Sequence, residues 1–434
     1  MKGEDFGVVP RWASALAGGM TEIDEVRPVG DAEPVGQTAA RTGESGRVRS
    51  GGWPAVGALA AGTFTVVTSE MLPVGLLTPI GGDLGISDGT AGLTLTVTGL
   101  VAAVAAPVLT LLVGRMDRRV VLVALMGMLA VANLLAANAS NVVVLLVARV
   151  LVGLGMGGVW ALAAGLAVRL VPGRRVAVAT SLIFSGVAAA SVLGVPAGAF
   201  VGELGGWRTA FVAMAVVCAV VAVALAALLP PLPSTGAVRL SGVLGLFRSA
   251  PVRTGLLLVA LLVTGHFAAY TYVRPVLEEV AGAGAGQIGT LLLAFGVAGL
   301  AGNFAAGTGA ARSPRATALV ICGVLASAVL LMPVLGRGAG VPVAAVLLAV
   351  WGLAYGGVSV STQTWLMAAA PGAREAASAL FVGVFNGAIA LGAFAGGRAA
   401  DGWGTTGVMW LGGALAVGAL VTVVAGRAPE GGKR

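Results

Sequence analysis

The stretch Thr68-Ser69-Glu70-Met71-Leu72-Pro73-Val74-Gly75 decides the fold that we predict for this chain. It lies inside an apolar run from Val56 to Ile80, in which Glu70 is the only charged residue. At 1.5 Å per residue the run reaches roughly 37 Å, enough to cross a bilayer with some tilt. A carboxylate at that depth costs on the order of 2.5–3.5 kcal/mol on insertion scales, so we expect it to have a task. We predict that Glu70 carries a proton; the alternative is a structural acid held by one ion pair to a neighbouring helix.

The composition indicates an all-α membrane protein. The chain has 434 residues, of which 58% are hydrophobic and 10% are charged, whereas soluble domains carry about 25% charged residues. The 69 glycines suit helices that pack closely in lipid. The formal net charge of +8 does not indicate nucleic acid, because the basic residues lie in short loops between apolar runs, where they report topology. Cys218 and Cys322 have no metal-binding spacing.

Twelve apolar spans follow a polar N-terminal segment, which we expect to be a disordered cytoplasmic tail. The predicted organisation is a tail over 1–53, an N-terminal six-helix half over 54–229, a cytoplasmic interdomain loop over 230–250, a C-terminal six-helix half over 251–425 and a cytoplasmic tail over 426–434. The spans are 54–80, 90–113, 120–138, 141–170, 176–202, 207–229, 251–277, 287–310, 314–334, 340–368, 373–398 and 405–425.

The loop charges predict the orientation. With the N-terminus inside, the inner loops carry twelve arginines and the outer loops and span ends carry four: Arg115, Arg118, Arg119, Arg169, Arg174, Arg175, Arg239, Arg248, Arg253, Arg312, Arg315 and Arg374 against Arg208, Arg274, Arg337 and Arg398. This asymmetry follows the positive-inside rule. We therefore expect a multi-pass protein of the cell membrane with both termini cytoplasmic. We expect it to be a monomer in the lipid bilayer, with protons and a small molecule as its partners.

The two halves of the chain repeat each other. Thr68-Ser69-Glu70 with Pro79 is matched by Thr264-Gly265-His266 with Pro275. Further matches at offsets of 196–199 residues pair Gly99, Arg115, Arg118, Gly153 and Arg175 with Gly296, Arg312, Arg315, Gly352 and Arg374. Two six-span halves in the same orientation are the parallel repeat of one transporter architecture, in which the substrate binds between the halves near the midplane.

Arg149 is the second charge that we expect to be buried in the first half. Glu70 lies about ten residues before the outer end of its span and Arg149 about eight residues after the outer start of the fourth, so both lie roughly 12–15 Å below the outer surface. Equal depth predicts an interaction between them, direct or through water. The alternative is an arginine that supports its helix by bonding backbone carbonyls.

Two further stretches bear on conformational change. In the fifth span, Gly194-Val195-Pro196-Ala197-Gly198 combines a kinking proline with small residues, which predicts a bent helix packed closely on a neighbour. Gly114-Arg115-Met116-Asp117-Arg118-Arg119 fills the loop between spans two and three. Its arginines are candidates for a cytoplasmic latch with Asp117 or for helix capping, and inside-positive anchors are the alternative.

These features resemble the major facilitator superfamily, and within it the bacterial twelve-span drug:proton antiporters of the sugar, purine-nucleoside and chloramphenicol efflux branch. The resemblance covers residues 54–425. It implies that Arg149 supports proton coupling and that the Gly194–Gly198 stretch is the motif typical of exporters. The loop motif is one residue shorter than usual between Gly114 and Asp117, and Met156 stands where the branch often has a histidine. The stretches that carry the match are Thr68-Ser69-Glu70, Pro73-Val74-Gly75-Leu76-Leu77, Asp117-Arg118-Arg119, Gly194–Gly198 and Gly206-Trp207-Arg208.

Polar and aromatic residues near the middles of the spans are candidates for the substrate cavity and for proton coupling. His266, the only histidine, occupies the repeat position of Glu70, and its ordinary pKa of about 6.5 lets it titrate near neutrality; the alternative is a packing histidine. The other candidates have helix packing as their alternative role: Asn133, Trp160, Phe184, Phe267, Tyr270, Asn303, Tyr355 and Asn386.

We therefore predict a proton-coupled exporter (antiporter) of small molecules such as drugs, sugars or nucleosides, which works by alternating access. A proton-coupled importer of a small metabolite is the alternative. The spans carry no buried cluster of His, Asp and Glu and no serine–base arrangement, and the chain lacks a Gly-x-x-x-x-Gly-Lys motif, so we expect neither an enzyme nor a cofactor.

Overall fold

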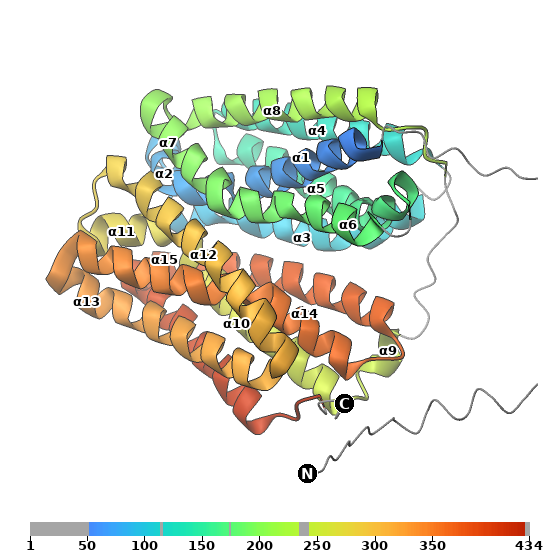
Figure 1. The fold of residues 1–434 in the computed structure, drawn as a ribbon. Helices are drawn as coiled ribbons and strands as arrows, with labels where there is room; N and C mark the ends of the chain where they lie inside the picture. The colour runs from blue at the N-terminus through green and yellow to red at the C-terminus, as the bar shows by residue number, and fades with distance from the viewer. Residues whose placement is uncertain (1–51, 113–115, 173–174, 234–242, 430–434) are drawn as a thin grey trace, which may run out of the picture. The chain divides into compact units, whose positions relative to one another are not determined.

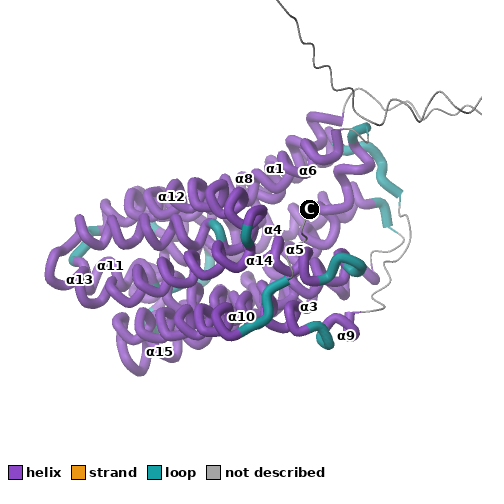
Figure 2. Tube along the Cα trace, turned by 60° about the horizontal axis from the view of Figure 1, so that its bottom comes forward, coloured by secondary structure: helices purple, strands orange, loops and turns teal. Residues whose placement is uncertain are grey.

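The computed structural model describes residues 52–112, 116–172, 175–233 and 243–429. Within these ranges the chain is helical and contains no β-strand, which confirms the predicted fold class (Figures 1 and 2). The main helices are α1 (Gly52–Met71), α2 (Leu77–Leu84), α3 (Asp88–Leu112), α4 (Arg118–Ala137), α5 (Val142–Leu170), α6 (Val176–Ala189), α7 (Val195–Gly205), α8 (Trp207–Leu228), α9 (Val243–Leu246), α10 (Ala250–Tyr270), α11 (Val273–Ala281), α12 (Ala285–Arg312), α13 (Pro314–Gly356), α14 (Val358–Ala369) and α15 (Arg374–Ala425).

The stretch around Glu70 forms one crossing with a break in it. Helix α1 ends at Met71, a 3₁₀ helix covers Leu72–Leu76, and α2 continues to Leu84. Pro73 stands at the start of the 3₁₀ helix and has no N–H to donate to the preceding turn, so the α-helical hydrogen-bond ladder stops there. Glu70 is thereby held in the last turn of α1.

Within the described residues, ten helical stretches are long and apolar enough to cross a membrane. Two of them, Pro314–Ala369 and Ala376–Ala425, are about twice as long as one crossing requires. Helix α13 has 43 residues and leaves helical geometry at Gly340, where φ is 68°. Helix α15 has 52 residues and does the same at Gly404, where φ is 72°. Positive φ suits glycine because it has no Cβ. Each long helix therefore supplies two crossings, in agreement with the twelve predicted spans.

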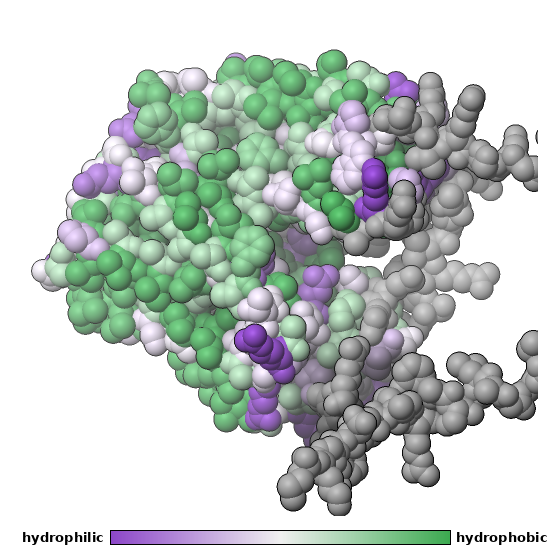
Figure 3. Space-filling view, viewed as in Figure 1, coloured by the Kyte–Doolittle hydropathy of each residue, from purple (hydrophilic) through white to green (hydrophobic). Residues whose placement is uncertain are grey.

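The buried apolar residues form two cores. One is built from α1–α8 and the chain that follows, up to Leu232. The other is built from α10–α15 and also takes in a few residues of the first group, among them Val74, Leu77 and Val195. In Figure 1 the first group of helices is blue to green and the second is yellow to red. Apolar side chains cover much of the face seen in Figure 3, as expected for helices that face lipid.

Charged residues mark two ends of the helices. We call one the acidic end, defined by Asp83, Asp88, Glu278, Glu279 and Asp401, and the other the basic end, defined by Arg118, Arg119, Arg169, Arg253, Arg312 and Arg315. Three hydrogen bonds between described residues join the two groups of helices at the acidic end. On the side of the basic end, the surface in Figure 3 is hollowed between the two groups.

Candidate functional site

Glu70 and Arg149 lie together inside the first group of helices. Glu70 is 3% exposed and Arg149 is fully buried. The guanidinium donates from Nη1 to the backbone carbonyl of Ser69 at 2.8 Å and interacts electrostatically with the Glu70 carboxylate. Oε1 of Glu70 and both Nε and Nη2 of Arg149 have no hydrogen-bond partner. Buried polar atoms in native proteins are normally paired, so this site holds capacity for a proton, a water molecule or a ligand group.

Small polar groups on three further helices bond the backbone or the neighbours of this pair. Asn133 on α4 donates from Nδ2 to Oγ of Ser69 at 3.2 Å and to its own helix at Leu129 O, 2.9 Å away. The thiol of Cys218 lies 3.6 Å from the same nitrogen, and Thr98 donates to the carbonyl of Arg149 at 3.3 Å. The sequence predicted Asn133 as a cavity residue. Ser69, Cys218 and Thr98 were not predicted as site residues, because a small polar side chain in an apolar helix carries little signal.

The Arg149 geometry bears on both predicted roles of this residue. Arg149 bonds a backbone carbonyl, that of Ser69 on the neighbouring helix α1, and its Cζ lies 5.0 Å from the centre of the Phe211 ring, within cation–π range. Its charge also faces the carboxylate of Glu70. In a low-dielectric interior a fixed cation stabilises the ionised form of a neighbouring acid strongly. The geometry is therefore compatible with both predicted roles, because Arg149 bonds the backbone of α1 and interacts electrostatically with Glu70.

The fifth span packs directly on the stretch around Glu70. A π-helical turn covers Ala190–Gly194, and Pro196 stands near the start of α7. A Cβ added at Gly194 would lie 2.6 Å from Oγ1 of Thr68, and Cβ atoms at Gly198 and Gly202 would overlap Leu72 and Leu76. The three glycines are spaced four residues apart, and so are the residues that they face, Thr68, Leu72 and Leu76. The two sets therefore form matching rows along the two spans. This is the close packing that the glycine and proline pattern predicted.

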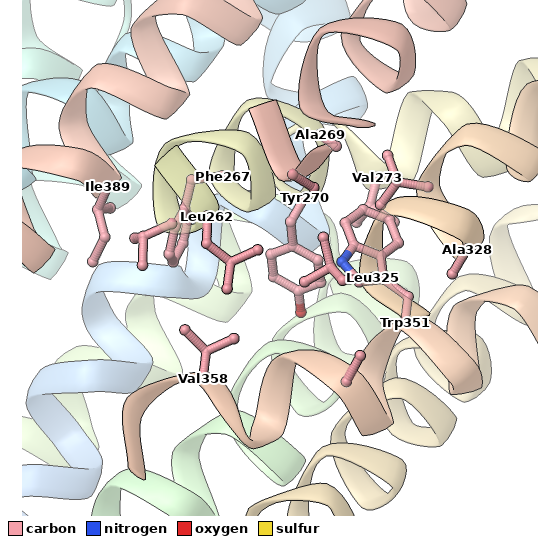
Figure 4. Packing of buried hydrophobic residues seen from close by; sticks show 14 of the residues in the cluster. Leu262, Phe267, Ala269, Tyr270, Val273, Leu325, Ala328, Trp351, Val358 and Ile389 are labelled. Atoms are coloured by element: carbon pink, nitrogen blue, oxygen red, sulfur yellow. The ribbon is translucent and has the colours of Figure 1, made fainter. Parts of the chain in front are cut away.

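In the second group of helices, six aromatic rings surround one another. We call this set, His266, Phe267 and Tyr270 of α10, Phe295 of α12, and Trp351 and Tyr355 of α13, the aromatic cluster. Figure 4 shows Phe267, Tyr270 and Trp351 within the buried core. Tyr355, unlike the other five, is only half-buried. Its phenol group also interacts electrostatically with Glu70, so the aromatic cluster lies within electrostatic range of the predicted proton site.

The remaining candidate residues are more dispersed. Trp160 and Phe184 stack on each other in the first group, with ring centres 5.9 Å apart. Asn386 is half-buried and donates to Val382 of its own helix at 2.9 Å, as a helix-packing asparagine does. Asn303 is half-buried on α12. The structure thus brings Tyr270 and Tyr355 together with His266 and leaves Trp160 and Phe184 as a separate stacked pair.

The loop between spans two and three is tied to the start of the interdomain segment. Asp117 caps α4 by accepting from the N–H of Arg119 at 2.8 Å, and it also accepts from the N–H of Leu232 at 3.0 Å. The N–H of Arg118 in turn donates to the carbonyl of Leu232, and Arg119 donates to that of Ala226. The Leu232 N–H holds the pKa of Asp117 below its ordinary value. Gly114, the first residue of the predicted motif, lies outside the described residues.

Charged residues at the acidic end were not predicted as functional, yet they join the two groups of helices. Arg274 donates from Nη1 to the carbonyl of Gly75 at 2.7 Å and from Nε to Glu278 at 2.8 Å. Glu278 also accepts from Thr78 at 2.7 Å. Asp401 accepts from the N–H of Gly89 at 3.1 Å. The sequence placed these residues only at the ends of spans, where charged residues are common.

The fold and this site define a class: a multi-pass membrane transporter with charged groups buried between its helices. The pattern of the Major Facilitator Superfamily matches residues 59–381, and the chain belongs to that family, as its motifs predicted. This assignment points to a transporter rather than an enzyme.

Individual relatives agree with the family. The purine ribonucleoside efflux pump NepI of Salmonella paratyphi B is 34% identical over 374 residues, which cover 86% of this chain and 94% of that protein. The structure of the nucleoside transporter NupG matches with a TM-score of 0.71 at 12% identity, over 86% of this chain and 98% of that one. A bacterial homologue of the human lysosomal transporter Spinster, in an inward-facing and occupied conformation, matches with a TM-score of 0.67 at 15% identity, over 85% and 94%. At these identities the solved structures establish the fold alone.

Proposed function

We propose that this protein is a proton-coupled exporter of small molecules, and that purine ribonucleosides are its substrates. The observation that carries the proposal is the buried pair of Glu70 and Arg149, which has unpaired polar atoms and whose carboxylate interacts electrostatically with Tyr355 of the aromatic cluster in the opposite group of helices. The substrate class is supported by the 34% identical purine ribonucleoside efflux pump. The packing of Gly194 and Gly198 on the helix of Glu70 supports the export direction, because that glycine–proline stretch resembles the motif typical of exporters.

In this mechanism Glu70 is the proton carrier. With a proton bound, the buried carboxyl group is neutral and tolerates the apolar interior; without one, it depends on the charge of Arg149. Since proton and substrate occupy adjoining sites, arrival of one lowers the affinity for the other. Outward movement of substrate is thereby exchanged for inward movement of a proton.

The proposed moving units are the halves 54–229 and 251–425. In the arrangement described above they are joined at the acidic end, which we assign to the outside because the basic end carries the inner arginines. Alternating access then requires the acidic-end hydrogen bonds to break while the basic end closes. The protein works in the cell membrane as a monomer, with both termini in the cytoplasm.

The experiment that tests this uses everted membrane vesicles with an acid-inside gradient, followed by a pH-sensitive dye. Inosine, adenosine, a pentose, a phenicol and a lipophilic cation are added in turn to vesicles with the wild type or Glu70→Gln. We expect inosine or adenosine to dissipate the gradient with the wild type and to have no effect with Glu70→Gln. Glu203→Gln is the matched control, because Glu203 is exposed.

The same assay separates the alternatives. Equal responses from the wild type and Glu70→Gln would show that Glu70 is structural. Proton movement in the same direction as the substrate, measured with labelled inosine, would show an importer.

A further inference from the structure

The rings around His266 are arranged as a stack with a surrounding wall. The Tyr355 ring lies parallel to the His266 ring, with centres 3.3 Å apart and 7° between the planes. Tyr270 and Phe295 are also nearly parallel to it, at 19° and 20°. Phe267 and Trp351 stand edge-on, at 88° and 77°. Parallel faces with perpendicular walls are the surroundings in which a further flat ring gains stacking contacts.

The hydrogen bonding of His266 fixes what its ring presents. The indole N–H of Trp351 donates to Nδ1 of His266 at 3.0 Å, so Nδ1 is the acceptor and the proton of the neutral ring lies on Nε2. That Nε2 is buried and has no hydrogen-bond partner, in a residue that is 1% exposed. A buried N–H without an acceptor is unfavourable. A ligand that places an acceptor against Nε2 would therefore bind more tightly than one that does not.

We propose that the aromatic cluster is the binding site for the purine base of the substrate, with Tyr355 and its stacked neighbours on the face of the base and the Nε2–H of His266 donating to a ring nitrogen or carbonyl oxygen of the base. This deepens the proposed function and rests on it for the class of substrate. Purines fit because they combine a flat π surface with acceptors on their edges. A pentose has no flat π ring, and a lipophilic cation has no acceptor for the Nε2–H group.

Tyr355 gives this site a route to the proton carrier. It stacks on His266 of its own half and interacts electrostatically with Glu70 of the other. A base that enters the stack must move or cover the half-buried Tyr355, and so changes the surroundings of the Glu70 carboxyl group. His266 thus binds the base of the substrate, and Glu70 alone exchanges the proton.

The test is equilibrium binding of tritiated inosine to the purified protein in lipid nanodiscs, without any proton gradient. Competitors are inosine, 7-deazainosine, 3-deazainosine, 6-thioinosine and uridine. If a ring nitrogen accepts from Nε2, the deaza compound that lacks that nitrogen should compete about tenfold less well than inosine. If the carbonyl oxygen is the acceptor, the 6-thio analogue should show this loss instead. The tenfold figure corresponds to the loss of one buried hydrogen bond. Uridine, with a smaller ring, competes more weakly than any purine.

Variants identify the donor. His266→Phe keeps a ring in the stack and removes the N–H, so it binds inosine about tenfold more weakly and no longer distinguishes inosine from the analogues. Trp351→Phe removes the bond that fixes the proton on Nε2 and gives a smaller loss. Trp365→Phe is its matched control, because Trp365 is equally buried but donates to Pro251 instead. Should His266→Phe not yield monodisperse protein, the analogue series on the wild type and Trp351→Phe still decide.

The outcomes separate this inference from the proposed function. Inosine-driven proton movement in vesicles, combined with equal binding of inosine and every analogue, overturns the base site and leaves export standing. A preserved pattern of analogue discrimination without proton movement supports the base site and overturns proton coupling. Absence of purine binding to the wild type overturns the base site.

Discussion

Glu70 occupies the last turn of α1, where the unpaired carbonyl groups of a helix carry partial negative charge. A carboxylate at that position is disfavoured both by burial and by the helix end, so it needs a nearby cation to ionise. Arg149 supplies the cation from α5 while its Nη1 bonds the carbonyl of Ser69 in that same last turn. The arginine therefore offsets the charge of the helix end and of the acid at once.

This double role predicts that charge alone does not suffice at residue 149. In Arg149→Lys the charge stays, but the planar fork that bonds Ser69 and the contact with Phe211 are lost. We expect substrate-driven proton exchange in vesicles to fall by roughly 10-fold or more, as the loss of a charged hydrogen bond implies, while inosine binding in nanodiscs changes less than about threefold. Arg169→Lys at the basic end is the control. Full exchange activity in Arg149→Lys would mean that only the charge matters.

For individual residues, the sequence predicted which charged side chains are buried better than it predicted their hydrogen-bond partners. Glu70 and Arg149 were found because a charge stands out in an apolar run, and their equal depth followed from the rise of a helix. The contacts of Arg274, Thr78 and Glu278 were not predicted, because rise per residue gives depth but not the direction in which a side chain points around the helix axis. The bond of Trp351 to His266 joins residues 85 positions apart and leaves no local pattern.

At the scale of elements, glycine positions set how closely helices approach. Gly186 of α6 faces the backbone of α1, where an added Cβ would overlap the carbonyl of Ala60 and lie 2.9 Å from the N of Phe64. Thr63 donates across the same contact to the carbonyl of Ile183 at 2.6 Å. Backbone atoms cannot rotate away as a side chain does, so this contact holds α1 at a fixed distance from the fifth span.

Gly186→Ala is therefore expected to destabilise the protein, although alanine is the better helix former by about 1 kcal/mol. Overpacking against backbone costs roughly 1–3 kcal/mol, so the midpoint of thermal unfolding in detergent should fall. Gly127→Ala on α4 is the matched control, because its Cβ would meet nothing within 4 Å, and it should leave the midpoint unchanged or raise it. A Gly186→Ala protein as stable as the Gly127→Ala protein would contradict the close approach of α1 and α6. Fluorescence-detected size exclusion after heating gives both midpoints.

The sequence predicted the elements well because apolar runs and bounding charges are local signals. Spans nine and ten, and eleven and twelve, are separated in the structure only by a non-helical glycine, Gly340 or Gly404. Hydropathy located these boundaries within a few residues. The break inside the first crossing at Leu72–Leu76 was not predicted, although Pro73 was its signal, because a proline in an apolar span is as often a mild kink.

For the whole molecule, the proposed alternating access depends on the contacts between the two groups of helices. Arg274 bonds Gly75, Glu278 bonds Thr78, and Asp401 bonds the N–H of Gly89. Each of these hydrogen bonds joins a residue of the first group of helices to a residue of the second. An equilibrium between two packings shifts by the free energy of the contacts that only one of them makes.

Arg274→Ala should open the acidic end. Its side chain makes charge-assisted bonds worth about 1.5–3 kcal/mol each, so the population with this end open rises roughly tenfold or more. Spin labels on Gly82→Cys and Gly402→Cys report this by double electron–electron resonance in a Cys218→Ala, Cys322→Ala background, because both glycines are exposed and an added Cβ meets nothing there. Arg208→Ala is the matched control, since Arg208 at the same end bonds Asp83 and Ala139 inside one half. Longer distances in Arg274→Ala alone support a gate between the halves; equal distances in both variants would show that Arg274 only stabilises its own helix.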